Sequence, residues 1–305
     1  MRYFARRILS AVPALLGILT ITFFLLTLVP GDPVDLMLGE QASAPDKQSL
    51  RHDLGLDQPL AQRYIHFLKN TLQGDLGKSF SSRKQVSVEI AERFPATAEL
   101  ALTAMLIALV FGIPFGVFAA INKNVFFDHA VRLFSLTGTS LPSFWIVPLL
   151  VYLFALKLDW LPVSERGGID HLILPAVTLS LGLIAVLSQV TRAAMLEVMN
   201  EDFVRTAKAK GASQHRIYFR HALANAAIPI ITVSALQFGA VLTGTVIVET
   251  IFDWPGLGTL LFQAIQNRDY PVVQATVLVI AVTYAAVNFV ADLLYAFANP
   301  KVRLT

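Results

Sequence analysis

Residues 100–121 read LALTAMLIALVFGIPFGVFAAI, a run of 22 residues that contains no Asp, Glu, Lys or Arg. A bilayer core about 30 Å thick is crossed by about 20 apolar residues of helix, so this run is long enough for one transmembrane helix. Five further charge-free windows of similar length lie at residues 8–31, 133–156, 172–191, 222–248 and 270–291. The sequence therefore predicts an all-α polytopic membrane protein with six transmembrane helices.

The composition of the chain agrees with a membrane protein. Of its 305 residues, 55% are hydrophobic and 15% are charged, whereas soluble domains carry about 25% charged residues. The net charge of +3 gives no indication of nucleic-acid binding. The absence of Cys excludes disulfides, thiolate metal ligands and cysteine nucleophiles.

Two stretches depart from a simple membrane helix. The window 133–156 contains the small polar run 137–140 and Pro142, which membrane helices tolerate where a neighbouring helix covers them. We expect this span to face protein. A seventh uncharged stretch, 254–267, has only 14 residues and contains prolines and glycines. It is too short to cross and is expected to lie at the membrane surface or to dip in.

The basic residues predict the orientation. The first window follows Arg2, Arg6 and Arg7, but its apolar core is too long for a signal peptide, so we expect an uncleaved anchor. With both termini inside, the short inner segments carry 13 Lys and Arg and the short outer loops carry 3. Short loops rich in Lys and Arg stay in the cytoplasm. The expected organisation is a tail with the first helix (1–31), an extracytoplasmic segment (32–98) and a core of five helices (99–305).

The extracytoplasmic segment has helical patterns of its own. Residues 58–74 place Leu60, Tyr64, Phe67, Leu68 and Leu72 on one face, with Asp57 as a possible N-cap and Gly74 as the end. Residues 86–94 form a second pattern that runs into Pro95. The segment is either a small cap on the outer ends of the helices or a surface that contacts a substrate-delivery protein.

The loop within residues 197–225 is the most charged of the short loops, yet apolar residues alternate with its charges. Gly211 can adopt the positive φ that ends a helix, and Ser213 can cap a second helix. The pattern predicts a helix, a tight turn and a helix parallel to the membrane surface. Such a loop either binds anionic lipid head groups or docks a cytosolic partner; its mixed faces favour docking.

No catalytic constellation is found. The six His lack metal-ligand spacing, and Gly77-Lys78-Ser79 lacks the glycine that a phosphate loop needs at position 72. No charged residue lies in the middle of a predicted span, although proton relays and ion-coupled carriers normally need one. The polar or kinking candidates within the spans are Ser140, Pro142, Gln189, Gln237, Thr243, Thr245 and Asn288. A protein that moves a solute with such a sequence needs an ATP-hydrolysing partner or is passive.

Several motifs carry a family resemblance. Residues 205–211, RTAKAKG, followed by His221-Ala222-Leu223, are similar to the EAA loop of ABC-importer permeases in its peptide-class form. Further matches are Pro30-Gly31-Asp32-Pro33, residues 54–59, 74–77, 249–252, 255–258 and 268–274, and Asn299-Pro300-Lys301-Val302-Arg303. The chain resembles the first permease subunit of dipeptide, oligopeptide, glutathione or nickel importers. One departure is Gln85, where that family usually has Pro, which puts the local outer turn in doubt.

The resemblance implies a type I ABC-importer permease fold in a bacterial cytoplasmic (inner) membrane, with no catalytic site or bound cofactor of its own. The implied partners are a second homologous permease, two cytosolic ATPases that bind ATP and Mg, an extracytoplasmic binding protein and membrane lipid. The residues implied for ATPase docking are Glu201, Asp202, Phe203, Arg205, Thr206, Ala207, Gly211, Arg216 and His221. Those implied for the outer mouth are Trp254, Pro255, Gly256, Leu257, Gly258, Asp269 and Tyr270. The translocation path would run between the two permeases, so this chain would line half of it. The residues that could line it are Ser140, Pro142, Gln189, Gln237, Thr243 and Asn288.

Three functions remain open from the sequence. The importer permease is favoured; a stand-alone ion-coupled carrier or channel and a membrane-embedded enzyme lack the residues that each would need. Peptides are the expected cargo, with glutathione, nickel or another small solute as alternatives. No residue in this chain discriminates among them, because cargo in such systems is selected mainly by the separate binding protein.

Overall fold

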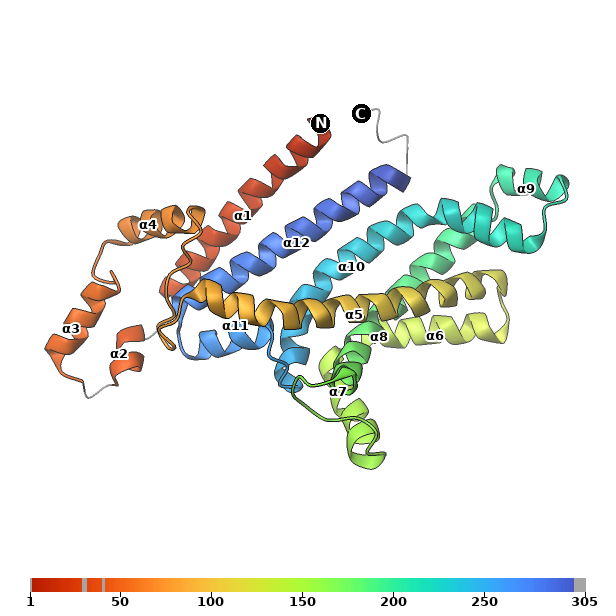
Figure 1. The fold of residues 1–305 in the computed structure, drawn as a ribbon. Helices are drawn as coiled ribbons and strands as arrows, with labels where there is room; N and C mark the ends of the chain where they lie inside the picture. The colour runs from red at the N-terminus through yellow and green to blue at the C-terminus, as the bar shows by residue number, and fades with distance from the viewer. Residues whose placement is uncertain (1, 29–31, 40–41, 299–305) are drawn as a thin grey trace. The chain divides into compact units, whose positions relative to one another are not determined.

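The computed structural model describes residues 2–28, 32–39 and 42–298. Within these residues all regular elements are helices, and the single extended pairing is an antiparallel bridge between Lys78 and Gln85 (Figure 1). The all-α fold class is confirmed. The motif residues Pro30 and Gly31, the closing motif at 299–303 and the side chain of Thr243 lie outside what the structure describes.

The chain divides into two compact units, each built from separate stretches of sequence. Unit 1 comprises Met1–Thr97 and Pro255–Ala285, and unit 2 comprises Ala98–Trp254 and Ala286–Thr305. Unit 1 holds α1 (Arg2–Leu28), α2 (Pro33–Leu38), α3 (Ala44–Asp53), α4 (Leu60–Leu72) and α11 (Leu257–Gln266). Unit 2 holds α6 (Phe126–Ser140), α7 (Ser143–Leu150), η1 (Val151–Lys157), α8 (Ile169–Val198), α9 (Asp202–Ala209), η2 (Arg216–Ala222) and α10 (Leu223–Ile251). Two helices, α5 (Val86–Ile121) and α12 (Tyr270–Ala298), belong partly to each unit.

The predicted spans are found as helices, but within the described residues fewer than six of them are long and apolar enough to cross a membrane. Among the described residues, four helices are long and apolar enough to cross a membrane: Val86–Ile121, Ile169–Val198, Arg216–Val241 and Tyr270–Ala291. The window 133–156 is bent by 113° between α6 and the helix that follows, so it is a broken span or a re-entrant loop. Pro142 stands at this break, where it directly precedes α7 and cannot continue the backbone hydrogen bonds of α6. The apolar stretch Val12–Leu25 lies within α1.

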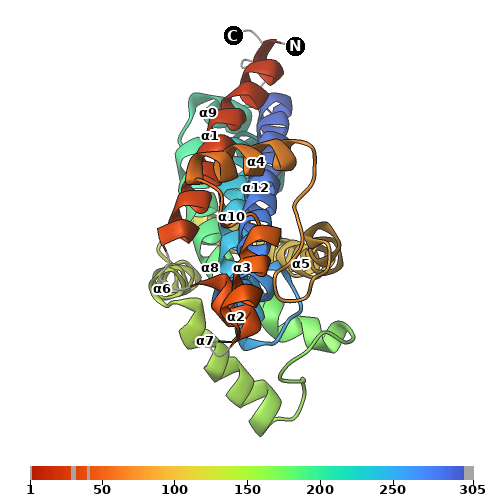
Figure 2. The ribbon, with the colours of Figure 1, turned by 90° about the vertical axis from the view of Figure 1, so that its left-hand side faces the viewer.

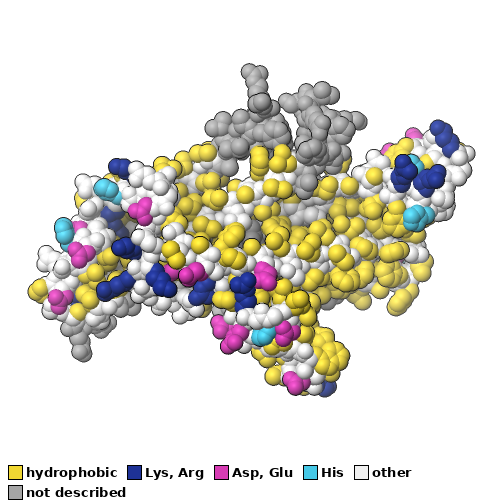
Figure 3. Space-filling model, viewed as in Figure 1, with side chains coloured by type: hydrophobic (Ala, Val, Ile, Leu, Met, Phe, Trp, Pro, Cys, Tyr) yellow, Lys and Arg dark blue, Asp and Glu magenta, His cyan; other side chains and the backbone are white. Residues whose placement is uncertain are grey.

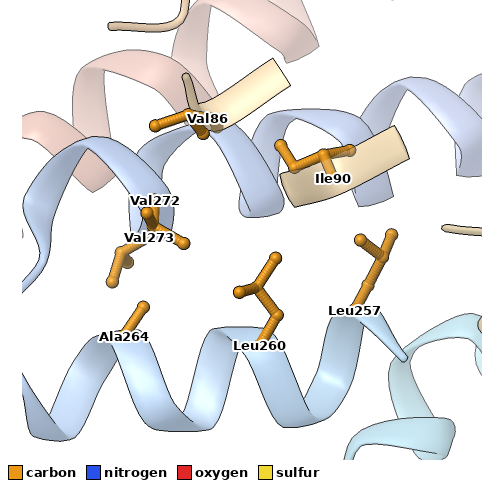
Figure 4. Close-up of a cluster of buried hydrophobic side chains, with 8 residues drawn as sticks. Val86, Ile90, Leu257, Leu260, Ala264, Val272 and Val273 are labelled. Atoms are coloured by element: carbon orange, nitrogen blue, oxygen red, sulfur yellow. The ribbon is translucent and has the colours of Figure 1, made fainter. Parts of the chain in front are cut away.

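The core of unit 1 is an apolar cluster formed by the start of α5, α11 and the start of α12 (Figure 4). Val86 and Ile90 on α5 point towards Leu257 and Leu260 on α11, and Val272 and Val273 of α12 close the cluster. The stretch 254–267, which is too short to cross a bilayer, contains the short helix α11, whose apolar face is covered within the unit.

The segment 32–98 differs in part from the expected pattern. The helix expected at 58–74 is α4, Leu60–Leu72, and its N-cap is Pro59, since the Asp57 carboxylate pairs with His52 instead. The helix α4 lies across α1 (Figure 2). Tyr64 and Phe67 of α4 pack on Phe23 of α1, and the Tyr64 hydroxyl lies 2.7 Å from Thr20 Oγ1. Leu72, which was expected on the packed face, is 78% exposed.

Pro95 does not end the second helix of this segment. The prediction of a helix ending there was wrong, because α5 continues from Val86 to Ile121 without a break. Proline removes one backbone donor from a helix, and its fixed φ is itself helical, so a membrane helix covered by neighbours accommodates it. The turn before α5 is well formed at Gln85: its two ladder hydrogen bonds come from the N–H groups of Ser79 and Val86, so neither Gln nor Pro at 85 affects them.

In unit 2, α8 is the central helix, and α6, α7 and α10 pack around it (Figure 1). Glycines allow the closest approaches. A Cβ added to Gly116 of α5 would lie 2.5 Å from the Ser188 carbonyl oxygen and from Thr191 Cβ of α8, and one added to Gly138 of α6 would lie 2.7 Å from Ala185 Cβ. Small residues at such contacts stabilise membrane helix packing by letting backbones come close together.

Candidate functional site

The loop that carries α9 has the helix–turn–helix form expected from its sequence. We call residues 199–213 the α9 loop. Gly211 has a φ of +77°, and the N–H groups of Gly211 and Ala212 donate to the carbonyls of Lys208 and Ala207, which closes the end of α9. The next helix begins after Ser213, whose carbonyl accepts from Ile217 N–H, and it continues through η2 into α10. The turn depends on Gly211, because a β-carbon is strained at this φ.

Most of the residues predicted to dock the ATPase are exposed. Val204 and Ile217 are buried and hold α9 against η2. The exposed members of the predicted set are Glu201, Asp202, Phe203, Arg205, Thr206, Gly211 and Arg216, while Ala207 and His221 are partly buried. Phe203 and Phe219 leave apolar surface exposed among the charges, and Lys, Arg and His side chains gather at the α9 end of the unit (Figure 3). The loop offers a mixed apolar and cationic surface.

A buried apolar cluster lies at the base of the α9 loop. It joins Val117 and Ala120 of α5, Ala194 and Met195 of α8, and Ala222, Ala226 and Ile230 from the η2–α10 helix. Met199 and Val198 pack against it at the point where the loop leaves α8. Both arms of the loop therefore enter one cluster that joins three helices of unit 2.

A buried ion pair beside this base was missed by the sequence reasoning. The Asp128 carboxylate on α6 is wholly buried and accepts from Arg192 Nε (2.5 Å) and Nη2 (2.9 Å) on α8. It also accepts from Asn124 N–H (2.9 Å), and Arg132 Nε lies 3.8 Å away. Sequence reasoning counted Arg132 and Arg192 for orientation only. The overlooked signal was Asp128, an acidic residue in an otherwise basic stretch between two spans.

The residues predicted for the outer mouth fall into both units. In unit 2, Trp254 is 1% exposed, and the Arg166 guanidinium lies 5.9 Å from its ring centroid. Arg166 also donates to Glu99 Oε2 from Nε (3.0 Å) and Nη2 (2.6 Å). The indole therefore serves as a platform for the loop between η1 and α8 and offers almost no free surface to a partner.

In unit 1, the predicted mouth residues are also largely covered. Gly256, Leu257 and Gly258 are buried, Pro255 is partly buried, and Leu257 N–H donates to Thr97 Oγ1 at 2.7 Å. Asp269 is 2% exposed, and its carboxylate accepts from Ser79 Oγ (2.5 Å) and from the N–H groups of Phe80 (3.1 Å) and Ser81 (3.0 Å). Tyr270 is partly buried, with its ring centroid 6.3 Å from that of Phe80.

The polar residues predicted to line a path are dispersed over unit 2. Ser140, Pro142 and Gln189 are exposed, while Gln237 and Asn288 are partly buried. The Ser140 hydroxyl donates to the Leu136 carbonyl of its own helix at 2.8 Å. Thr245 is buried. These residues form no single site within the unit. Among the described residues, no group of three His, Asp or Glu side chains could hold a metal ion.

Ion pairs connect the short helices of the segment 32–98. Arg51 of α3 pairs with Asp32, Lys47 Nζ lies 2.9 Å from Asp35 Oδ1, and His52 Nδ1 lies 2.9 Å from Asp57 Oδ2. The hydrogen bond to Asp57, and then its charge, raises the pKa of His52 above 6.5. The hydrogen bond from His52 holds the pKa of Asp57 below 3.8.

These two shifts predict the pH range of the His52–Asp57 pair. The stabilisation of the fold that comes from the raised pKa of His52 is complete below pH 6.5 and is lost as the pH rises through that pKa. The stabilisation that comes from the lowered pKa of Asp57 is complete above pH 3.8 and is lost as the pH falls through that pKa. An NMR titration of the His52 ring should give a midpoint above 6.5 that returns towards 6.5 in Asp57→Asn. Asp53→Asn should change this midpoint far less, since the charge of Asp53 raises the pKa of His52 less than Asp57 does. An unchanged midpoint in Asp57→Asn would contradict the pairing.

Several apolar helices of spanning length define a multi-pass integral membrane protein. Residues 112–304 match the family described as binding-protein-dependent transport system inner membrane component, and residues 1–101 match the N-terminal part of the membrane component of such systems. The chain belongs to this family and is an inner-membrane permease of ABC importers.

Individual relatives match over nearly the whole length. A di/tripeptide transport system permease protein of Pseudomonas aeruginosa is 44% identical, with 99% of this chain and 98% of the relative covered. Glutathione transport system permease proteins of Escherichia coli and Pectobacterium atrosepticum are 40% and 41% identical, with 99% of each chain covered. A chain of the inward-facing MetNI methionine ABC transporter has a similar fold, with a TM-score of 0.61 and 14% identity over 69% of this chain and 96% of that one.

Proposed function

We propose that this permease imports di- and tripeptides or longer oligopeptides, driven by ATP that partner subunits hydrolyse. The support for a peptide cargo is the 44% identity to a di/tripeptide permease over nearly the full length of both chains. The nearly equal identity to glutathione permeases keeps glutathione, itself a small peptide, as the alternative. The ligand of the cognate binding protein, identified by calorimetry or mass spectrometry, decides between them.

The proposed mechanism rests on one observation: α9 is exposed, and the two ends of its loop are anchored in a buried apolar cluster. In our proposal the α9 loop lies in the cytoplasm and fits a groove of one of two ATPases, with its charged residues and Phe203 as contacts. Closing of the ATPases, which bind ATP and Mg, displaces α9, and the cluster at its base transmits this to α5, α8 and α10. The chain itself needs no cofactor.

The rest of the proposed assembly is a second, homologous permease and an extracytoplasmic binding protein. Both termini and the α9 loop lie on the cytoplasmic side, and the segment 32–98 lies on the opposite side. The path runs between the two permeases, so Ser140, Gln189 and Gln237 line half of it. Trp254, Leu257 and Asp269 are buried, so we assign them to shaping the outer mouth, and the contact with the binding protein falls to the exposed surface around them.

Gly211→Val tests the coupling role. Valine at a φ of +77° costs roughly 1–2 kcal/mol or more and distorts the turn that orients α9. We expect normal membrane insertion, loss of co-purification with the ATPases, and loss of uptake. Gly211→Asn is the matched control, because Asn tolerates positive φ better than other residues, so most of the uptake should remain.

Arg205→Glu tests the same surface by charge alone. Arg205 and its partner Asp202 are exposed, with 3.3 Å between Nη1 and Oδ1, so their pairing adds little to stability. Loss of uptake with an unchanged unfolding temperature therefore reports on the partner contact. Normal uptake in both Arg205→Glu and Gly211→Val would refute the assignment of α9 as the coupling element.

A further inference from the structure

A large cavity between the segment 32–98, the end of α1 and the start of α12 is explained by none of the functions above. Its volume is about 1110 Å³, and residues from α3, the α3–α4 connection, α4 and the start of α12 line it. A second cavity of about 400 Å³ adjoins it, and Arg63 of α4 and Tyr270 of α12 line both. All these residues belong to unit 1. Sites for small ligands usually measure about 300–1,000 Å³, so the larger cavity can take a whole short peptide.

The charges of the larger cavity favour an anion. Its walls carry Lys47, Arg51 and Arg63 against the carboxylates of Asp32 and Asp57. Each of these carboxylates already has a partner, Arg51 for Asp32 and His52 for Asp57, so neither is left to repel an incoming anion. Lys47 is likewise paired, with Asp35.

Arg63 is different from the other cations of the cavity. Its side chain is partly buried, and among the described residues it has no ion-pair partner. A guanidinium offers five N–H donors in a planar fork that fits the two oxygens of a carboxylate. A guanidinium that is paired with none of the carboxylates of the cavity wall is suited to receive one from a ligand. The hydroxyl of Tyr270 in the same wall can supply one more donor.

We propose that this cavity is a binding site for the C-terminal carboxylate of a peptide in transit, with Arg63 as its principal contact and Tyr270 as a second donor. The proposal rests on the peptide cargo and on the extracytoplasmic side proposed above. It adds to them a step in which the permease itself holds the peptide by its free carboxylate after release from the binding protein.

The experiment compares a tripeptide with its C-terminal amide. The complete transporter, with its ATPases and binding protein, is reconstituted in phosphatidylcholine vesicles, and both peptides are used at concentrations that saturate the binding protein. For each peptide, initial uptake by Arg63→Gln is divided by uptake by the unaltered transporter. Arg63→Gln should lower uptake of the free acid about tenfold more than uptake of the amide, because a charge-assisted hydrogen bond typically supports a factor of this order.

Two further variants distinguish a direct contact of Arg63 with the peptide from a structural effect of its substitution. Arg63→Lys keeps the charge and should retain part of the preference for the free acid. Lys69→Gln removes an exposed cation from the same helix, outside the cavity lining, and should affect both peptides equally. An equal loss for acid and amide in Arg63→Gln would overturn the proposal.

A dependence on lipid would overturn the proposal as well. If Arg63 bound a phosphate of a lipid head group, the effect of Arg63→Gln would change when phosphatidylglycerol is added to the vesicles and would be the same for both peptides. If the unaltered transporter takes up neither peptide, the proposed peptide cargo is refuted, and so is this site, which depends on that cargo. Uptake of peptide without any acid-specific effect of Arg63→Gln refutes the site alone.

Discussion

Gly116→Ala in α5 is expected to destabilise unit 2 by about 2 kcal/mol. The added Cβ meets the Ser188 carbonyl oxygen and Thr191 Cβ, both at 2.5 Å. Neither obstacle is the flexible end of a side chain, so α5 and α8 must separate. Overpacking of this kind costs about 3 kcal/mol at the upper end of the usual range. Alanine returns about 1 kcal/mol through its higher helix propensity, which is too little to offset the clash.

The matched control for this prediction is Gly182→Ala in α8. The nearest atom to its added Cβ is the Gly138 carbonyl oxygen at 3.9 Å, an ordinary contact. Here the gain in helix propensity acts without the clash, so the variant should be as stable as the unaltered protein or slightly more stable. Thermal unfolding in detergent, followed by intrinsic fluorescence, measures both. Equal unfolding temperatures for the two variants would contradict the close approach of α5 and α8.

Arg192→Met is expected to cost about 3–5 kcal/mol, because it leaves the carboxylate of Asp128 buried without its main partner. The carboxylate is wholly buried, and its remaining groups are Asn124 N–H and Arg132, whose Nε is 3.8 Å away. Asp128→Leu should cost less than Arg192→Met. The side chain of Arg192 is 17% exposed, so its guanidinium can still reach water.

A double-mutant cycle measures the interaction between the two residues. Asp128→Leu/Arg192→Met should be more stable than Arg192→Met alone, because the double variant leaves no uncompensated charge. Removal of the exposed pair between Asp202 and Arg205 is the control, and it should change the free energy of unfolding by less than about 1 kcal/mol. Additive effects of Asp128→Leu and Arg192→Met would show that the pair does not act as a unit.

The sequence predicted best the features that depend on local chemistry. The turn at Gly211 is one of these, since only a positive φ at that position connects α9 with the following helix. The segment around α11 is another in part: its 14 uncharged residues were expected to be too few to cross a bilayer, whereas its helix was not predicted. Family membership could be inferred for a different reason: motifs such as the RTAKAKG of residues 205–211 occur in a fixed order along the chain.

The features that sequence reasoning missed depend on contacts between distant residues. Asp128 and Arg192 are separated by 64 positions, and hydropathy treats each as an isolated charge at the end of a span. The 113° bend at Pro142 is invisible in the apolar window 133–156, because hydropathy records length and not direction. Pro95 was read as a helix end from its local effect alone, whereas α5 continues past it into unit 2.

The cavity at Arg63 lies beyond sequence reasoning for the same reason. Its walls come from α3, α4 and the first residue of α12, and only the folded chain brings Tyr270 next to Arg63. The charge pattern of residues 32–63 does not indicate that Arg51 pairs with Asp32 and His52 with Asp57. It therefore does not indicate that Arg63 is left to bind a ligand.

The burial of Asp269 has a consequence for the order of events during synthesis. The backbone N–H groups of Phe80 and Ser81 and the hydroxyl of Ser79 all donate to its carboxylate, which follows Ser79 by 190 residues. At a translation rate of about 5–20 residues per second, the carboxylate leaves the ribosome roughly 10–40 s after its three donors. The turn at residues 79–81 therefore reaches its final hydrogen bonding only after most of the helices have been made, and a chain released before residue 269 would lack it permanently.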